Sequence, residues 1–388
     1  MLRTNVCVVG AGPAGSVASL FLSKNKVPHI LVDRAMFPRE KVCGEFFDGR
    51  LQHVLNKIEP NFMQNMKEKN IIQDIRRYTY FNTKLEQLTV DTPLNRTARV
   101  SANRYDFDNY LLEEALKSKY VQYFDNTNIS TGTVTKAGVS LSNSTKSFEV
   151  EAQTAILATG SNSPLSQKFV PNNRAIGHFL LAARGYYRDI AKPDQQNVTQ
   201  VYFFRQPFPY YLCLVHLPNN LATVEVCMLK TVAAKHRVNP ESLLLNVVKE
   251  HAEIKKIFTD ATLEGKIKGA SLPKASGKQA ISAERILLAG SCSSIINPVT
   301  GWGVGHAAFE AMLAVNQYVA SAQMNNFSAK AFQEYDKKTH GALGKERLMG
   351  RLADWALMHG SSPLDWMIGC IASNAWLSRK ASALINSV

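Results

Sequence analysis

The sequence lacks the cysteine and histidine patterns that hold metal ions or disulfide frameworks. Its six cysteines are scattered without a CxxC pair, and its nine histidines show no metal-ligand spacing beside them. It also lacks internal repeats, low-complexity segments and any uninterrupted apolar run as long as a membrane span. These absences argue against a zinc module, a disulfide scaffold, a repeat protein and a transmembrane protein, and they favour a folded chain with free thiols.

Acidic residues are scarce relative to basic ones, with 31 Asp and Glu against 45 Lys and Arg, so the net charge is +14. Such a charge favours anionic partners: an acidic protein, a phospholipid surface or a phosphorylated substrate. Nucleic acid is not expected, because the basic residues are spread along the chain without a recognised nucleic-acid module. No signal peptide precedes the first expected strand, so the expected location is cytoplasmic, with peripheral membrane contact left open.

The first motif lies near residue 10, between an apolar strand expected at 5–9 and a helix expected at 13–24. It is a GxGxxG run formed by Gly10, Gly12 and Gly15. The first glycine permits a tight turn, the second lets the backbone approach a pyrophosphate, and the third allows the helix to pack closely on the strand. The free amides at the start of the helix then face the phosphates.

A second apolar stretch, residues 29–32, ends at Asp33, about twenty residues after the glycine run. A carboxylate at that place can accept a hydroxyl of the adenosine ribose. The strand, turn, helix and carboxylate together predict a dinucleotide site. No second GxGxxG is visible for a nicotinamide.

A second glycine-rich segment, LLAGSCSSIINPVTGWGVGHA, lies near residue 300 between an expected strand at 285–289 and a long expected helix at 304–322. It resembles the second flavin motif of the p-hydroxybenzoate hydroxylase type of FAD-dependent oxidoreductase, in its geranylgeranyl reductase and flavin halogenase-like branch. Supporting strings are Val42-Cys43-Gly44-Glu45, Arg104 with Phe107-Asp108 ahead of a helix, Ala158-Thr159-Gly160 and Leu272-Pro273.

The resemblance implies FAD as the cofactor and assigns residues to it along most of the chain. These residues are Gly10, Gly12, Pro13, Ala14, Gly15, Asp33, Arg34, Cys43, Arg104, Ala158, Thr159, Gly160, Gly290, Ser291, Asn297, Pro298, Thr300, Gly301, Gly303 and Val304. Arg104 is expected on the ribityl or pyrophosphate part, and the turn from Asn297 on the isoalloxazine. A helix N-terminus aimed at the isoalloxazine stabilises the negative charge of reduced flavin, by roughly 0.3 to 1 kcal/mol.

Two residues depart from the family pattern. Ser291 stands where the family has an Asp that hydrogen-bonds the ribityl chain, so the sequence leaves FAD affinity open. Trp302 stands where the family has a Glu, and its large ring is a candidate cover for the flavin or the substrate channel.

Three side chains are candidates for catalysis: Cys43 and Glu45, in the loop that resembles the one flanking the isoalloxazine, and Trp302. The favoured reaction is hydroxylation of an aromatic or bulky substrate through a C4a-hydroperoxide, including a tryptophan of an acidic partner protein during quinone cofactor maturation. The alternatives are reduction of C=C bonds in a prenyl or lipid substrate, and flavin binding without turnover. Halogenation is disfavoured, because the GWxWxIP string is absent. The electron donor is NAD(P)H or a separate reductase.

The expected fold class is α/β, or α+β overall. It consists of a Rossmann-like FAD-binding domain interleaved with an antiparallel-sheet substrate domain, followed by C-terminal helices. The FAD-binding domain is expected in residues 1–73, 96–175 and 265–325, the substrate domain in 74–95 and 176–264, and the helical region in 326–388. The helix after Arg104 is expected to be capped by Asp106 or Asp108.

Overall fold

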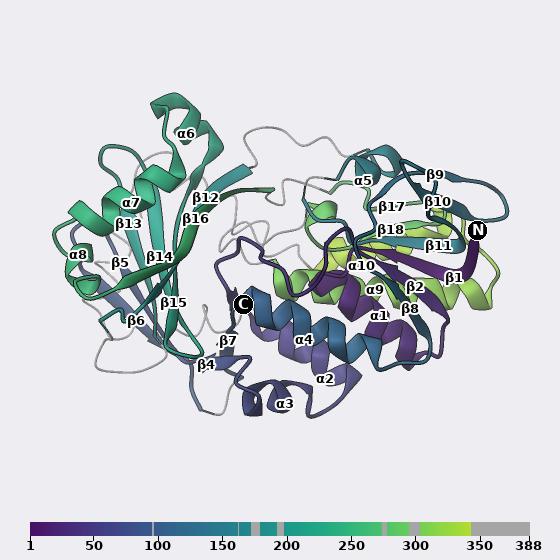
Figure 1. The fold of residues 1–388 in the computed structure, drawn as a ribbon, viewed down its shortest axis with the longest axis horizontal. Coiled ribbons are helices and arrows are strands. Elements are labelled where there is room, and N and C mark those ends of the chain that lie inside the picture. The colour runs from purple at the N-terminus through teal and green to yellow at the C-terminus, as the bar shows by residue number, and fades with distance from the viewer. Residues whose placement is uncertain are drawn as a thin grey trace.

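The computed structural model describes residues 1–94, 97–161, 163–171, 179–191, 198–273, 278–294 and 303–342. Two bodies lie side by side, each built on its own β-sheet (Figure 1). The larger body contains both chain segments that carry the glycine motifs. Within the described ranges, no helix is both long and apolar enough to span a bilayer.

The larger body is built on an eight-stranded sheet whose main path runs β17-β18-β11-β1-β2-β8. Strands β18, β11, β1, β2 and β8 are mutually parallel, while β10 pairs antiparallel with both β11 and β9. The strands are β1 Leu2–Val9, β2 His29–Val32, β8 Val121–Phe124, β9 Ile129–Val134, β10 Val139–Asn143, β11 Glu149–Leu157, β17 Ser282–Ala283 and β18 Ile286–Leu288. This arrangement confirms the predicted Rossmann-like α/β class.

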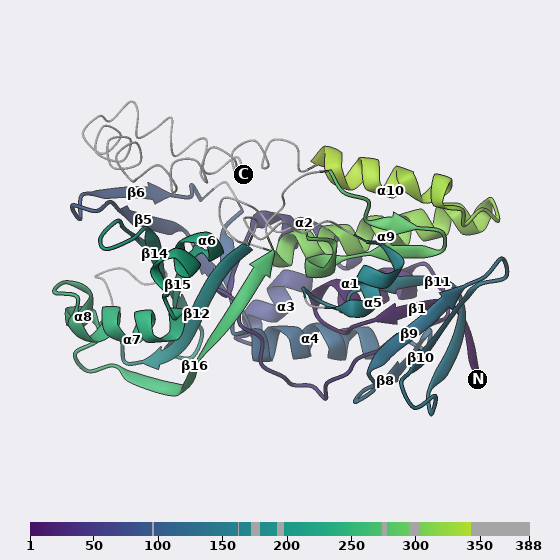
Figure 2. The ribbon, with the colours of Figure 1, turned by 90° about the horizontal axis from the view of Figure 1, so that it is seen from above.

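Helices cover this sheet, as the view from above shows (Figure 2). They are α1 Pro13–Lys24, α2 Gly49–Ile58, α3 Phe62–Glu68, α4 Arg104–Leu116, α5 Pro164–Phe169, α9 Val304–Gln323 and α10 Ala329–Ala342. Helix α1 packs on α9 and α4, and α10 packs on α9 and β17. The helices predicted after the two glycine motifs are therefore confirmed, and they are neighbours in space. Part of the expected C-terminal helical region, residues 343–388, lies outside the described residues.

The prediction for the cap of α4 is wrong. Asn103 is the N-cap, and its side chain accepts the Tyr105 N–H at 2.8 Å. Asp108 lies one turn inside the helix, where it is fully buried and pairs with Arg104. The acidic residue near the helix start is therefore an ion-pair partner, not a cap.

The smaller body is built on a seven-stranded sheet in the order β16-β12-β15-β14-β13-β5-β6, antiparallel except for the β13–β5 pair. Its strands are β5 Arg77–Phe81, β6 Gln87–Asp91, β12 Phe179–Arg188, β13 Val198–Phe204, β14 Tyr210–Leu217, β15 Leu221–Leu229 and β16 Thr262–Pro273. A small sheet, formed by β3 Phe46–Phe47, β7 Arg99–Ser101 and β4 Gln73–Ile75, belongs to the chain segment that joins the bodies. The expected domain boundary at residue 265 falls inside β16.

Strand alternation gives the seven-stranded sheet two different faces. One face packs on helices α6 Lys230–His236, α7 Pro240–Glu250 and α8 Ile254–Ile257 through a cluster that includes Leu212, Leu214, Val224 and Val226. The intervening residues point to the opposite face because side chains in a strand alternate. That opposite face is directed at the larger body, and it closes the candidate site.

Candidate active site

Four parallel strands end in one row at the edge of the larger sheet. In the register, Val9 pairs with Leu157 and with Val32, and Leu157 pairs with Leu288. The residues that follow these strands are tied together by backbone hydrogen bonds, from the Gly10 N–H to the Val32 oxygen at 2.7 Å and from the Ala158 N–H to the Val9 oxygen at 2.8 Å. Ligands of such sheets bind outside the carboxyl ends of the strands.

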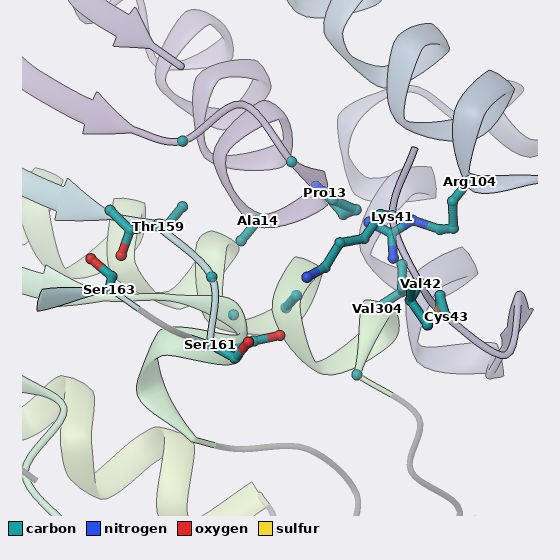
Figure 3. Close-up of a pocket in the computed structure, with 18 of the residues that line it drawn as sticks. Pro13, Ala14, Lys41, Val42, Cys43, Arg104, Thr159, Ser161, Ser163 and Val304 are labelled. Carbon is teal, nitrogen blue, oxygen red and sulfur yellow. The ribbon is translucent and has the colours of Figure 1, made fainter. Parts of the chain in front are cut away.

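A cavity of about 480 Å³ opens at this edge and extends to the free face of the smaller sheet. The predicted FAD residues that line it are Gly10, Gly12, Pro13, Ala14, Asp33, Arg34, Cys43, Arg104, Ala158, Thr159, Gly160, Gly290, Ser291, Gly303 and Val304. The close-up shows several of them converging from separate elements (Figure 3). The predicted residues Asn297, Pro298, Thr300, Gly301 and Trp302 lie outside the described residues.

Each of the three positions in the first motif favours glycine for a different physical reason. Gly10 has φ +102, and a Cβ there would lie 2.3 Å from the Ala158 oxygen. A Cβ on Gly15 would lie 1.7 Å from the Gly10 oxygen, so Gly15 packs behind the cavity, as close helix-to-strand contact requires. A Cβ on Gly12 would approach only the Arg39 guanidinium, at 3.1 Å. Gly12 therefore keeps open the space between the start of α1 and Arg39.

Asp33 lies directly after β2 and is buried at the cavity edge. One carboxylate oxygen accepts the Ala11 N–H at 2.6 Å, and the other accepts the Ala35 N–H at 2.8 Å. These bonds fix the carboxylate beside the glycine turn, and each oxygen keeps a further lone pair for a ligand hydroxyl. Its assignment to the ribose stays a prediction.

Basic side chains surround the same turn. Arg104 forms a buried, two-point ion pair with Asp108 at 2.6 and 2.7 Å, and Arg39 reaches the same carboxylate at 3.1 Å. Lys41 points into the cavity near Pro13 (Figure 3). Burial lowers the pKa of Lys41, and the charges of Arg104 and Arg39 lower it further. This group of cations matches a pyrophosphate.

Sequence reasoning missed Arg39 and Lys41, although both belong to the PREK string that precedes Cys43. The sequence feature that could have indicated them is a pair of cationic residues in a polar loop, just after the carboxylate predicted to bind the ribose. The loop has no helical or strand period, so the sequence could not show that it folds back over the glycine turn.

We expect Arg39→Met to weaken FAD binding by roughly ten- to a hundredfold, because a hydrogen bond to a charged group contributes about 1.5 to 3 kcal/mol. Titration of the apoprotein with FAD, followed by flavin fluorescence, measures the change. Arg3→Met is the matched control, since Arg3 is exposed and pairs with Glu151 at 3.2 Å. Equal affinity in the two variants would contradict the assignment of Arg39 to the phosphates.

The start of the late glycine-rich segment lies close to the first motif in space, although the two are far apart in the sequence. Gly290 has φ +79, and a Cβ there would lie 3.1 Å from the Ala14 Cβ at the start of α1. The buried Glu310 of α9 accepts the Gly290 N–H at 2.7 Å and the Ser293 hydroxyl at 2.8 Å. Sequence reasoning missed Glu310, which holds the turn that carries Ser291 in place.

Ser291 lines the cavity directly after this turn. We expect Ser291→Asp to tighten FAD binding by about tenfold, because a carboxylate accepts a ribityl hydroxyl more strongly than a serine does. Isothermal titration with FAD measures the effect, and Ser291→Ala should change affinity in the opposite direction. Unchanged or weaker binding in the Asp variant would contradict the ribityl position.

The smaller sheet contributes a wall of protic side chains to the cavity. Tyr211 and Cys213 of β14 face it together with Glu225 and Cys227 of β15, and they form two cross-strand pairs. Burial raises the pKa of Glu225 to about 7, opposed by the charge of Arg184. Sequence reasoning missed Glu225.

The predicted catalytic residues occupy different places. Cys43 lines the cavity, and burial raises its pKa, so it is a neutral thiol. Glu45 lies behind Cys43, fully buried, with φ +59. Its carboxylate accepts hydrogen bonds from the Tyr186 hydroxyl and from the Arg104 N–H, the latter at 3.3 Å.

A parallel sheet with a glycine turn, a ribose carboxylate, a cationic loop and a late helix N-terminus defines a dinucleotide-binding flavoprotein of the Rossmann-like type. The chain belongs to the family of FAD binding domains, which matches residues 3–325. The cofactor is FAD, and the glycine turn at the start of α1, with Arg39 and Lys41 lining the same cavity, fits its pyrophosphate. The protein is therefore an FAD-dependent oxidoreductase, which needs a redox substrate and an electron donor.

The similar proteins include a lipid reductase, a reductase-like structure and a flavin-dependent brominase. The digeranylgeranylglycerophospholipid reductase of Thermoplasma acidophilum is 21% identical over 99% of this chain and 95% of that protein. A geranylgeranyl bacteriochlorophyll reductase-like structure from the same organism has a TM-score of 0.83 at 18% identity, covering 99% and 96% of the two chains. The flavin-dependent brominase Bmp2 has a TM-score of 0.80 at 16% identity, covering 99% and 93%. An uncharacterized protein of Methanosarcina barkeri is 27% identical over 30% of this chain, and the match spans 28% of that protein's length.

Proposed function

We propose that this oxidoreductase reduces carbon–carbon double bonds of a prenyl or other lipid-like substrate, with Glu225 as the proton donor. Reduction of an isolated double bond adds a hydride to one carbon and a proton to the other. FAD supplies the hydride when it is bound and reduced. The observation that supports the proposal is a buried carboxylic acid on the cavity wall, whose pKa of about 7 leaves it about half protonated at neutral pH and largely protonated below it.

The position of the Glu225 side chain suits a proton donor. Its Oε2 lies against Gly44, 2.7 Å from the position that a Cβ would take there. Its Oε1 is buried without a geometric hydrogen-bond partner among the described residues, while a side-chain hydrogen bond with Cys227 lowers the pKa of the group. Arg184, directly beside Glu225 in the strand register, stabilises the carboxylate that remains after proton transfer.

The rest of the cavity suits an apolar substrate. Leu180 and Leu272 from the smaller sheet and Val304 from α9 also line it. Apolar surface of this kind binds hydrocarbon by removing it from water. The names of the reductase relatives above fit such a substrate, and the high positive charge of the chain fits a phosphate-bearing or membrane-held one.

Hydroxylation of an aromatic or bulky substrate is the second candidate. Tyr211 faces the cavity, and the aromatic strands around it give a surface on which a ring can stack. Under this reading Glu225 is a base for a phenol. A tryptophan of an acidic partner protein remains a prediction for this reaction.

The test compares the two reactions with one enzyme preparation. The flavin is reduced by dithionite without oxygen and incubated with geranylgeraniol, and separately incubated in labelled oxygen with a lipid-tailed phenol. A product that gains two hydrogen atoms without oxygen supports the reductase. A product formed only with oxygen, and carrying the label, would replace it with the hydroxylase. Colourless protein that cannot be reconstituted with FAD would leave a protein without turnover.

A further inference from the structure

A second buried carboxyl group lies behind the cavity wall, at the contact between the two bodies. Glu45 has no exposed surface, and its loop is fixed by the Ala102 N–H, which donates to the Glu45 backbone oxygen at 3.1 Å. Its side chain is covered from the other body by Tyr186 and Arg184 of β12. A buried carboxyl in such a place needs a role besides packing, because its burial costs free energy.

The two oxygens of the Glu45 side chain differ in their hydrogen bonds. Oε1 accepts from both the Tyr186 hydroxyl and the Arg104 N–H. Oε2 is buried and has no hydrogen-bond partner within the described ranges. Burial raises the pKa of Glu45 to about 8, and within the described ranges Oε2 is the oxygen without a hydrogen-bond donor, so a proton on this group is best accommodated there.

Glu45 lies between Tyr186 and the cavity-lining Cys43, bonded to the first by its side chain and to the second by its backbone N–H. On one side, the partly buried Tyr186 also donates to the Asn103 side-chain oxygen, at 3.3 Å, where α4 begins. On the other side, the Glu45 N–H donates to the Cys43 sulfur at 3.5 Å. The Cys43 thiol lines the cavity, and the charges of Glu45 and Glu225 both raise its pKa.

We propose that Tyr186 and Glu45 form the route by which protons from solvent reach Glu225. This rests on the proposed function, in which Glu225 gives its proton to a substrate carbon and becomes a carboxylate. The Glu45 carboxyl then passes its proton to Glu225, through the Cys43 thiol or a water molecule. Tyr186 returns a proton to Glu45 and takes one from solvent. No electrons move in these steps, and one proton enters for each proton used.

The charged and titratable groups around the route set its direction. Arg184 faces both carboxyl groups from β12, with its guanidinium 3.7 Å from the centre of the Tyr186 ring. Arg104 faces Glu45 and Cys43 from α4. Cys213, Cys227 and Tyr211 surround Glu225 on the sheet face. Arg184 stabilises whichever carboxyl is ionised, so a proton can move between them without leaving an unpaired buried charge.

The experiment measures hydrogen–deuterium exchange of the Glu225 carboxylic acid by rapid-mixing infrared spectroscopy of the FAD-loaded enzyme at pH 6, without substrate. The Glu225 band is identified by its loss in Glu225→Gln. We expect exchange to slow by about tenfold or more in Glu45→Gln and in Tyr186→Phe, because the transferring group is removed. Glu264→Gln, which changes an exposed carboxylate paired with Arg188, should exchange at the wild-type rate. Wild-type exchange rates in both route variants would overturn the proposal.

A kinetic comparison separates this route from the proposed function. With geranylgeraniol and pre-reduced enzyme, Glu45→Gln should transfer its first proton at the wild-type rate, because Glu225 is already protonated. Its steady-state kcat should fall by about tenfold or more. Equal loss in both phases would make Glu45 a structural residue and overturn the route while the reductase stands. Absence of any reduction by wild-type enzyme would overturn the reductase, and the exchange measurement would still decide the route.

Discussion

Replacement of Gly12 by glutamate is expected to leave a folded protein that binds no FAD. The start of α1 and the Arg39 guanidinium enclose the space over Gly12, and a side chain there first meets Arg39 at 3.1 Å. A glutamate would fill this space, pair with Arg39 and repel the pyrophosphate. Like charges brought together in a binding site cost several kcal/mol, so affinity should fall by at least about a hundredfold.

The measurement is the flavin absorbance per mole of purified protein, with thermal unfolding recorded on the same sample. Gly341→Glu is the control, because Gly341 lies in the exposed end of α10 with nothing within 4 Å of its Cβ position. It adds the same charge to another glycine and should retain full flavin content. Retained flavin in Gly12→Glu would contradict the assignment of the glycine turn to the phosphates.

The glycine turn and the carboxylate after β2 could be predicted because the motifs that indicate them are local in the sequence. The run from Gly10 to Gly15 lies between a strand and a helix that each follow from ten or so residues, and Asp33 ends the next strand. The turn from Asn297 was predicted on the isoalloxazine and lies outside the described residues, whereas Gly290, a few residues before it, lies close to Ala14 at the start of α1. Once the α/β class is known, the parallel strands bring the turns that follow them to the same edge of the sheet.

The cavity wall formed by the smaller sheet could not be predicted, because it depends on strand pairing between segments that are distant in the sequence. Glu225 faces the cavity only because β15 pairs with β12 and β14 in a register that turns odd-numbered residues to that side. A shift by one residue would have turned Val224 and Val226 there instead. Fully buried strands show no alternation of apolar and polar residues, so the sequence of β15 does not reveal its two faces. Arg184 was hidden for the same reason.

Replacement of Glu225 by glutamine is expected to lower kcat for double-bond reduction by roughly 10² to 10⁴, the usual contribution of a positioned general acid. Glutamine keeps the size and one oxygen of the side chain but has no acidic proton. FAD content and the rate of flavin reduction by dithionite should stay as in wild type, because Glu225 lies on the smaller sheet, opposite the glycine turn. Loss of FAD along with activity would make Glu225 a structural residue.

The pH dependence gives this prediction its sharpest form. The acid must be protonated, so wild-type kcat should be constant below pH 7 and fall by about tenfold per pH unit above the Glu225 pKa of about 7. Arg184 lowers that pKa because its positive charge favours the carboxylate. Arg184→Gln should therefore move the falling limb to higher pH, whereas Glu225→Gln should abolish it and leave a low, flat profile. A limb that stays in place in both variants would assign the titration to another group and remove Glu225 from the proton-transfer step.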